Sequence, residues 1–253
     1  MAATRPLFGF HAVTARLRQR ARSVETLYVD AARRDARLRE LTSRAKAAGV
    51  AVHAVDAARL SALAGHEAHQ GVVAIVDAQL PYVTLDDVLA TLAEPALLLV
   101  LDGVTDPHNL GACLRSADAF GAQAVILPKD RAVGVNATVA KAASGAAETV
   151  PVVAVTNLAR TLRELKEHGI WLLGANERGE SLFDADLSGP IAWVLGAEGE
   201  GMRRLTRETC DRIVGIPMSG AVESLNVSVT AGICLYATRA ARSRDVAARR
   251  AVG

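Results

Sequence analysis

Residues 213–236, IVGIPMSGAVESLNVSVTAGICLY, place a strand, a glycine turn, a polar cluster and a helix in direct succession. The run 213–216 is typical of the end of a buried strand, and Pro217 removes the backbone donor that would continue it. Ser224 is expected to cap a helix whose apolar residues recur every three or four positions, with Asn226 in the first turn. This order predicts a reactive turn at a strand end, although the same residues also suit an ordinary capped core helix.

The length and composition are those of a folded protein. The 253 residues are enough for two domains, and 51% of them are hydrophobic while 22% are charged. No apolar run approaches the roughly 18 residues that a membrane span requires, so we expect no membrane association. The first residues lack the apolar core and cleavage pattern of a secretory signal, which predicts a cytoplasmic protein.

The three cysteines, Cys113, Cys210 and Cys234, are widely spaced in apolar surroundings. Their odd number and spacing predict reduced packing residues, and not disulfides or zinc ligands. The six histidines show no metal-ligand spacing either. We therefore expect no metal site.

Positive charge is concentrated at the front of the chain. Residues 1–78 hold 12 of the 29 Lys and Arg residues but only 7 of the 27 Asp and Glu residues. Arginines alternate along residues 16–22, where Arg16 and Arg18 begin the run, and more follow at residues 33–39. This pattern favours an anionic partner such as RNA, while the interspersed acidic residues also suit a solvated helix face.

The front of the chain also predicts a small α/β layer. Its strands are expected at residues 24–29, 50–55 and 71–76, with helices at about 33–48 and 57–64 between them. His11, after a glycine, and His69, in an HQG turn, either face one ligand or simply belong to turns. The predicted division of the chain is a first domain at 1–78, a connection at 79–94 and a second domain at 95–253.

From Ala96 onward, nearly continuous apolar strands alternate with helices. Strands are expected at 96–102, 124–128, 150–155, 170–175, 191–196 and 213–216, with helices near 109–120, 135–147, 157–168, 201–208 and 225–236. Apolar strands that alternate with helices indicate a parallel sheet covered on both faces, with ligands beyond the carboxyl ends of the strands.

Three turns lie at those strand ends. In the first, LDGVTDPHNLGACLRSADAFG, Asn109 is expected to cap a helix that ends at Gly121, and Arg115 points away from its buried stripe. In the second, LGAEGEGM, Glu198 follows a buried strand among three glycines. The third is the turn at 217–226. Polar side chains from all three turns are predicted to meet at one edge of the sheet.

The order and spacing of these turns resemble the three motifs of the SpoU (TrmH) family of RNA 2'-O-methyltransferases. The motifs are Asn109-x-Gly111-x-x-x-Arg115, Gly196-x-Glu198-Gly-x-Gly201, and Ile216-Pro-Met-x-Gly220 through Ser224-Leu-Asn226-Val-Ser228. The resemblance runs from about Gly9 to Tyr236 and does not reach the Arg-rich tail after Arg239. It departs at residues 176–180, which do not align clearly.

The resemblance implies an α/β fold with two parts. The first is a small RNA-binding domain similar to ribosomal protein L30e, and the second is a SPOUT-type parallel-sheet catalytic domain with a deep C-terminal trefoil knot. It also implies S-adenosylmethionine as the methyl donor, and a homodimer through the catalytic domain whose active sites use both subunits.

The resemblance further assigns roles to residues of this chain. The cofactor would be held by Gly174, Leu195, Gly196, Ile216, Met218 and Leu225. The catalytic cluster would comprise Asn109, Arg115, Glu198, Ser224 and Asn226. RNA would be bound by His11, Arg16, Arg18, His69 and Arg115. No metal is implied.

Arg115 is expected to clamp a substrate phosphate, because a guanidinium is almost never deprotonated in a protein and cannot act as the base. The base would be a water or a phosphate oxygen that Asn109 and Glu198 orient. Alignment of the attacking oxygen with the methyl group is expected to supply most of the rate enhancement.

The substrate that the resemblance implies is one guanosine ribose in the peptidyl-site loop of 23S ribosomal RNA. Three alternatives stay open: ribose methylation of transfer RNA, a non-catalytic ribosomal RNA-binding module, and a dinucleotide-binding oxidoreductase. The last is disfavoured because the glycines fall as G-x-x-G-x-G and no ribose-binding acid follows about 20 residues later.

Overall fold

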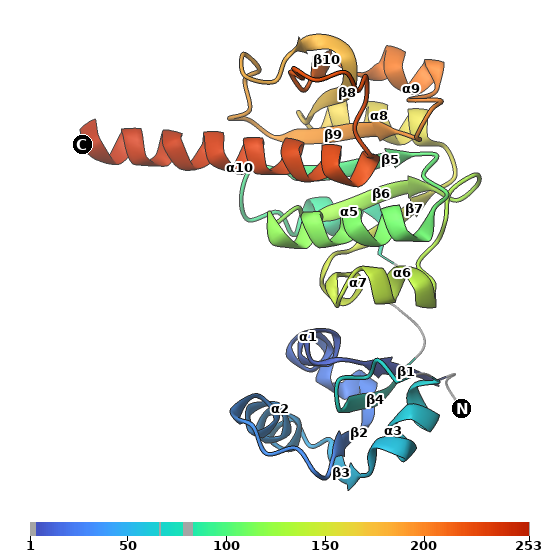
Figure 1. Ribbon diagram of the computed structural model, residues 1–253. Helices are drawn as coiled ribbons and strands as arrows, with labels where there is room; N and C mark the ends of the chain where they lie inside the picture. The colour runs from blue at the N-terminus through green and yellow to red at the C-terminus, as the bar shows by residue number, and fades with distance from the viewer. Residues whose placement is uncertain (1–3, 66, 78–82, 253) are drawn as a thin grey trace. The chain divides into compact units, whose positions relative to one another are not determined.

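The computed structural model describes residues 4–65, 67–77 and 83–252 (Figure 1). These residues form two compact units, one of Met1–Tyr82 with Ser144–Thr149 and the other of Val83–Ala143 with Val150–Gly253. The expected connection at 79–94 falls partly outside the described residues, since 78–82 are not among them. From Val83 onward it belongs to the second unit, and the return of the chain to the first unit at 144–149 was not predicted.

The first unit is a four-stranded sheet with helices on both faces. The strands lie in the order β1-β4-β2-β3, in which β2 and β3 are parallel and the other pairs are antiparallel. The predicted strands and helices after residue 24 are confirmed, whereas β1 and α1 were not predicted. The elements are β1 (Thr4–Phe8), α1 (Phe10–Arg20), η1 (Ala21–Ser23), β2 (Val24–Asp30), α2 (Ala36–Ala47), β3 (Ala51–Val55), α3 (Ala57–Ala64), β4 (Val72–Asp77) and α7 (Ala146–Thr149).

A buried ion-pair cluster lies inside the first unit. Arg16 has no exposed side-chain surface and donates to Glu148 Oε2 at 2.6 Å, to Ser23 Oγ at 2.7 Å and to Asp77 O at 2.7 Å. Arg5 also pairs with Glu148, at 2.5 Å. The Glu148 carboxylate therefore compensates the charge of the buried Arg16 guanidinium.

We expect Glu148→Ala to lower the free energy of unfolding by about 3–5 kcal/mol, because Arg16 would lose its buried counter-charge. Chemical denaturation of the full-length protein measures this. The control is Glu40→Ala, which removes an exposed i, i+4 pair with Arg44 and should cost no more than about 0.5 kcal/mol. Equal losses in the two variants would contradict the prediction.

The second unit is a six-stranded, fully parallel sheet in the order β10-β8-β9-β5-β6-β7, as predicted from the apolar strands. Figure 1 shows α5 and α10 side by side along this sheet. The elements are α4 (Leu85–Ala90), β5 (Leu97–Asp102), α5 (Pro107–Ala119), β6 (Ala124–Pro128), α6 (Ala137–Ala142), β7 (Val152–Val155), α8 (Leu158–Glu167), β8 (Trp171–Ser181), β9 (Ile191–Gly196), α9 (Arg204–Thr209), β10 (Arg212–Gly215) and α10 (Val227–Val252).

The strands of this sheet are buried on both faces. Leu98 and Val100 pack in a core with α4 and α8. On the alternate face, Trp193 donates its indole N–H to Thr238 Oγ1 of α10 at 2.9 Å. Among the described residues, no helix combines the length and hydropathy needed to cross a membrane.

Two helix caps differ from the predictions. Asp106, and not Asn109, caps α5 by accepting from the His108 N–H at 2.9 Å, so Asn109 lies within the first turn. Helix α10 begins at Val227, where the Asn226 side chain accepts from the Ser228 N–H at 2.8 Å. Asn226 therefore caps this helix in place of Ser224, because the turn continues two residues further than its apolar period indicates.

Candidate active site

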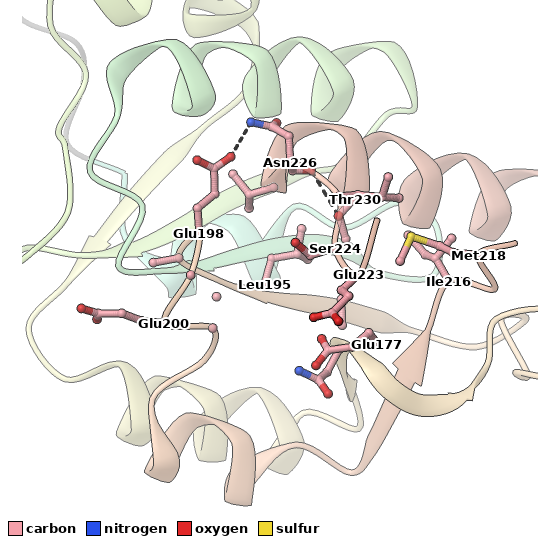
Figure 2. Close-up of a pocket in the computed structure, with 18 of the residues that line it drawn as sticks. Glu177, Leu195, Glu198, Glu200, Ile216, Met218, Glu223, Ser224, Asn226 and Thr230 are labelled. Carbon is pink, nitrogen blue, oxygen red and sulfur yellow. Dashed lines mark hydrogen bonds between the residues drawn. The ribbon is translucent and has the colours of Figure 1, made fainter. Parts of the chain in front are cut away.

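A cavity of about 620 Å³ opens where β9 and β10 end and α10 begins, beside residues 175–177 of β8, just beyond the part of β8 that pairs with β9. It lies at the carboxyl ends of the parallel strands, as the sequence predicted. Apolar side chains form part of the wall, and backbone of the loop at 197–201 forms another part. Figure 2 shows the Glu198 side chain directed toward Asn226, while that of Glu200 points away from it.

Five of the six predicted cofactor residues line this cavity: Leu195, Gly196, Ile216, Met218 and Leu225. Gly174 does not. A Cβ at Gly174 would meet the side chains of Ile213, Met202 and Cys210, so this glycine packs against the core. The wall on the β8 side is made instead by residues 175–177.

The loop at 197–203 is fixed to the sheet by a buried carboxylate. Asp102, at the end of β5, is 1% exposed and accepts from the Arg203 backbone N–H at 2.9 Å and from its Nε at 2.6 Å. In the sheet, Asp102 pairs with Gly196. These contacts hold the start of α9 beside the end of β9 and so position the loop that carries Glu198.

Asn226 joins the three predicted motifs. Its Nδ2 donates to Asn109 Oδ1 at 2.9 Å and to Glu198 Oε1, and its Oδ1 accepts from the Ser228 N–H and from Ser228 Oγ at 2.6 Å. Both amide protons and both lone pairs are thereby used. Asn226 therefore orients Glu198 and Asn109, and its own side chain has little capacity left for a ligand.

The remaining predicted catalytic residues differ in placement. Ser224 is exposed and lines the cavity. Arg115 is exposed on α5 but does not line the cavity. Within the described part of the chain, its guanidinium has no hydrogen-bond or ion-pair partner. One copy of the chain therefore joins Asn109, Glu198 and Asn226 by hydrogen bonds and places Ser224 at the same cavity, whereas Arg115 belongs neither to this cluster nor to the cavity lining.

Two of the predicted RNA-binding residues are buried in structural roles. Arg16 holds the ion pair with Glu148 and cannot contact RNA directly. His69 is 7% exposed, and its Nδ1 accepts from the Gly71 N–H at 3.0 Å while its Nε2 lies 3.1 Å from Ser61 Oγ. It supports the turn before β4. His11 and Arg18 are exposed.

The ionisable side chains that line the cavity are all acidic. They are Glu177, Glu198, Glu200 and Glu223, and among the residues that the structure describes no lysine, arginine or histidine lines it. Together with the apolar wall, these carboxylates suit a ligand that carries positive charge and apolar surface.

The cysteines are poor nucleophiles. Burial raises the pKa of both Cys113 and Cys234 to about 12, so their thiols stay protonated at neutral pH. Burial is also the largest cause that raises the pKa of Cys210 to about 12. Among the described residues, no group of His, Cys, Asp and Glu forms a metal site.

Sequence reasoning missed three residues that build this site. Ser228 was named in the third motif without a role of its own, although it fixes the Asn226 amide. The Asp102–Arg203 pair was also missed. A carboxylate directly after a fully apolar strand was the available signal, because a buried charge requires a partner.

Two known protein families match this chain, and one of the matches covers the three motifs. Residues 96–236 match the SpoU rRNA Methylase family, and residues 6–82 match the RNA 2'-O ribose methyltransferase substrate binding family. The first match contains the three turns, and the second overlaps residues 6–78 of the predicted first domain. The family resemblance seen in the sequence is thus confirmed.

Relatives are similar over nearly the whole chain. The 23S rRNA (guanosine-2'-O-)-methyltransferase RlmB of Ralstonia nicotianae is 60% identical over 247 residues, which cover 97% of this chain and 98% of that protein. The protein of the same name from Neisseria meningitidis serogroup B is 58% identical over 243 residues, or 96% and 97% of the two chains.

A solved structure agrees with this similarity. The SpoU methyltransferase AviRb from Streptomyces viridochromogenes, in complex with the cofactor AdoMet, aligns with a TM-score of 0.72 at 28% identity, covering 94% of this chain and 89% of that one. Both family matches and the similarity to relatives over nearly their full length agree with this structural similarity. This chain belongs to the SpoU rRNA methylase family.

Proposed function

We propose that the protein transfers a methyl group from S-adenosylmethionine to the 2'-hydroxyl of one guanosine in 23S ribosomal RNA. The observation that carries this proposal is the hydrogen-bonded cluster of Asn109, Glu198 and Asn226 at the wall of an acidic cavity. Relatives about 60% identical over nearly the full chain carry this activity in their names. By the same comparison, we propose the peptidyl-site loop as the target region.

S-adenosylmethionine fits the residues of the cavity. Its sulfonium and ammonium groups are cationic, which suits four carboxylates without a basic residue. Its apolar portions suit Leu195, Ile216 and Met218. Gly196 lets backbone lie close to the bound molecule. When bound, the donor supplies an electrophilic methyl group on sulfur.

Residues of this chain orient the group that removes the proton of the 2'-hydroxyl. Glu198 Oε1 accepts from the Asn226 amide, which leaves Oε2 outside that hydrogen bond. We propose that Oε2 and the Asn109 amide orient a water or phosphate oxygen that would accept the 2'-hydroxyl proton as the oxygen–carbon bond forms and the carbon–sulfur bond of the donor breaks, with the thioether as leaving group. General base catalysis of this kind contributes about a hundredfold to ten-thousandfold.

We propose that the active protein is a homodimer in which Arg115 reaches the active site of the partner copy. Arg115 lies outside the cavity of its own chain and is unpaired among the described residues. Nearby α10 exposes apolar side chains, with Val229 48% and Tyr236 61% exposed, and Tyr236 contacts Phe120 at the end of α5. Burial of this apolar surface would stabilise a dimer.

The finer features of the fold are part of the same proposal. We propose an L30e-like first unit and a deep trefoil knot in the second. Both features rest on the family to which the chain belongs. A cytoplasmic location follows from the proposed ribosomal RNA substrate.

The position of the methyl group tests the function. Incubation with labelled S-adenosylmethionine and unmodified 23S ribosomal RNA should yield one guanosine nucleotide that resists alkaline cleavage, because a methylated 2'-oxygen cannot attack its phosphate. Mass spectrometry of nuclease fragments would map it. DNA of the same sequence should accept no methyl group. Label on the base, or on transfer RNA alone, would contradict the proposal.

A further inference from the structure

Three segments of the first unit meet at one edge of its sheet. β1 ends there at Phe8, β2 ends there at Asp30, and β4 begins there at Val72. The Gly9 N–H donates to Val72 O at 3.1 Å, and the Asp30 N–H donates to Gly71 O at 2.9 Å. The exposed surface of this edge is therefore formed by the residues just beyond these strand ends.

The turn before β4 has an unusual backbone. Gln70 has a φ of 55°, in the left-handed region that non-glycine residues rarely adopt. It is flanked in space by Gly9, with a φ of 86°, and followed by Gly71, with a φ of 79°. A strained polar residue held by its neighbours is a common feature of ligand-binding surfaces.

Two arginines are stacked on one aromatic ring at this edge. The Cζ atoms of Arg33 and Arg37 lie 4.4 and 4.7 Å from the ring centroid of Phe10, whose side chain is buried. Arg33 also donates to Gln70 O at 2.7 Å. These contacts order both guanidinium groups before any ligand arrives.

The positive charge of this pair is only partly compensated. Asp35 accepts from Arg33, but it is also the N-cap of α2 and accepts from the Leu38 N–H at 3.0 Å. Among residues of the described chain, no carboxylate pairs with Arg37, whose Nη2 lies 3.0 Å from His11 Nε2. In that contact His11 Nε2 can only accept, because a guanidinium has donors and no acceptor. Among the described residues, Asp35 is thus the one carboxylate that pairs with either guanidinium group, and it pairs with Arg33.

We propose that Arg33, Arg37 and His11 form a phosphate-binding site that holds one backbone phosphate of the RNA substrate. A phosphodiester supplies the missing negative charge and accepts from a guanidinium fork. The exposed Gln70 amide lies beside it and can bind an adjacent ribose or base. This inference rests on the proposed function, because it takes the RNA to be the methylation substrate.

The test uses two full-length variants with the same change of charge on the same helix. Arg37→Gln removes a stacked arginine, whereas Arg39→Gln removes an exposed arginine that makes no ring contact. Filter binding of unmodified 23S ribosomal RNA is measured over a range of salt concentrations. Thermal unfolding and S-adenosylmethionine affinity, which should be unchanged, report whether each variant is intact.

We expect Arg37→Gln to weaken RNA binding about fivefold to tenfold and to reduce the slope of log Kd against log salt by about one phosphate contact. Arg39→Gln should change the affinity less than about twofold. Arg37→Lys should recover part of the loss, because it restores the charge but not the planar fork.

The binding results of the variants test the phosphate site, whereas those of the wild-type protein test the proposed function. Equal losses in Arg37→Gln and Arg39→Gln, or no loss in the first, would overturn the phosphate site while leaving the proposed function intact. A wild-type protein that fails to bind and methylate 23S ribosomal RNA would overturn the proposed function itself.

Discussion

Arg115→Ala is expected to reduce methyl transfer at least about a hundredfold while S-adenosylmethionine affinity stays within about twofold. The loss follows because a positioned cationic donor near the reacting group typically contributes a hundredfold to a thousandfold. The cofactor should still bind because Arg115 does not line the cavity. Single-turnover transfer from labelled donor and calorimetric titration of the donor measure the two quantities. Arg115→Lys should restore only part of the rate, since an ammonium lacks the planar fork.

Mixed dimers show whether Arg115 acts in the active site of its own subunit or in that of the partner subunit. Co-expression of Arg115→Ala with a cofactor-binding variant such as Gly196→Ala gives dimers that contain one of each subunit. If Arg115 acts across the interface, each mixed dimer has one intact site, and a random mixture should recover about a quarter of wild-type activity. No recovery would place Arg115 in the site of its own chain, and normal turnover by Arg115→Ala alone would refute its role.

Gly196→Ala is expected to weaken S-adenosylmethionine binding at least about a hundredfold. A Cβ at this position would lie under 3.0 Å from the backbone of Gly201 and Met202, and backbone cannot move aside as a flexible side chain does. The loop at 197–201 would have to shift, and it forms one wall of the cavity. Overpacking costs about 1–3 kcal/mol or more, and about 2.8 kcal/mol corresponds to a hundredfold.

Gly134→Ala is the matched control for this prediction. Its Cβ would meet no atom within 4 Å, and Gly134 is not among the glycines with a left-handed φ. We therefore expect unchanged cofactor affinity and unchanged thermal unfolding. Calorimetric titration of both variants provides the comparison. Tight donor binding by Gly196→Ala would show that the loop does not form the cofactor site.

Local patterns in the sequence determined most of the second unit. The apolar strands and the helices between them have the predicted type because side-chain periodicity is a property of short segments, except that the helix expected near 135–147 is interrupted by a turn at 143–145. The three polar turns meet because the carboxyl ends of parallel strands share an edge. Five of six expected cofactor residues line the cavity for the same reason. The exception, Gly174, faces the core because the direction of a strand residue depends on its neighbours in the sheet.

Contacts between distant residues were decided only by the tertiary structure. Arg16 has the pattern of an exposed arginine run, yet it is buried because Glu148, 132 residues away, supplies its counter-charge. Asn226 and Asn109, 117 residues apart, form one hydrogen-bonded cluster. A lone arginine, asparagine or aspartate gives no local signal of its partner, since the free energy of burying a polar group depends on what it meets. The sequence by itself therefore determined the elements and the edge where the site lies, while packing decided which polar residues face the ligand and which support the fold.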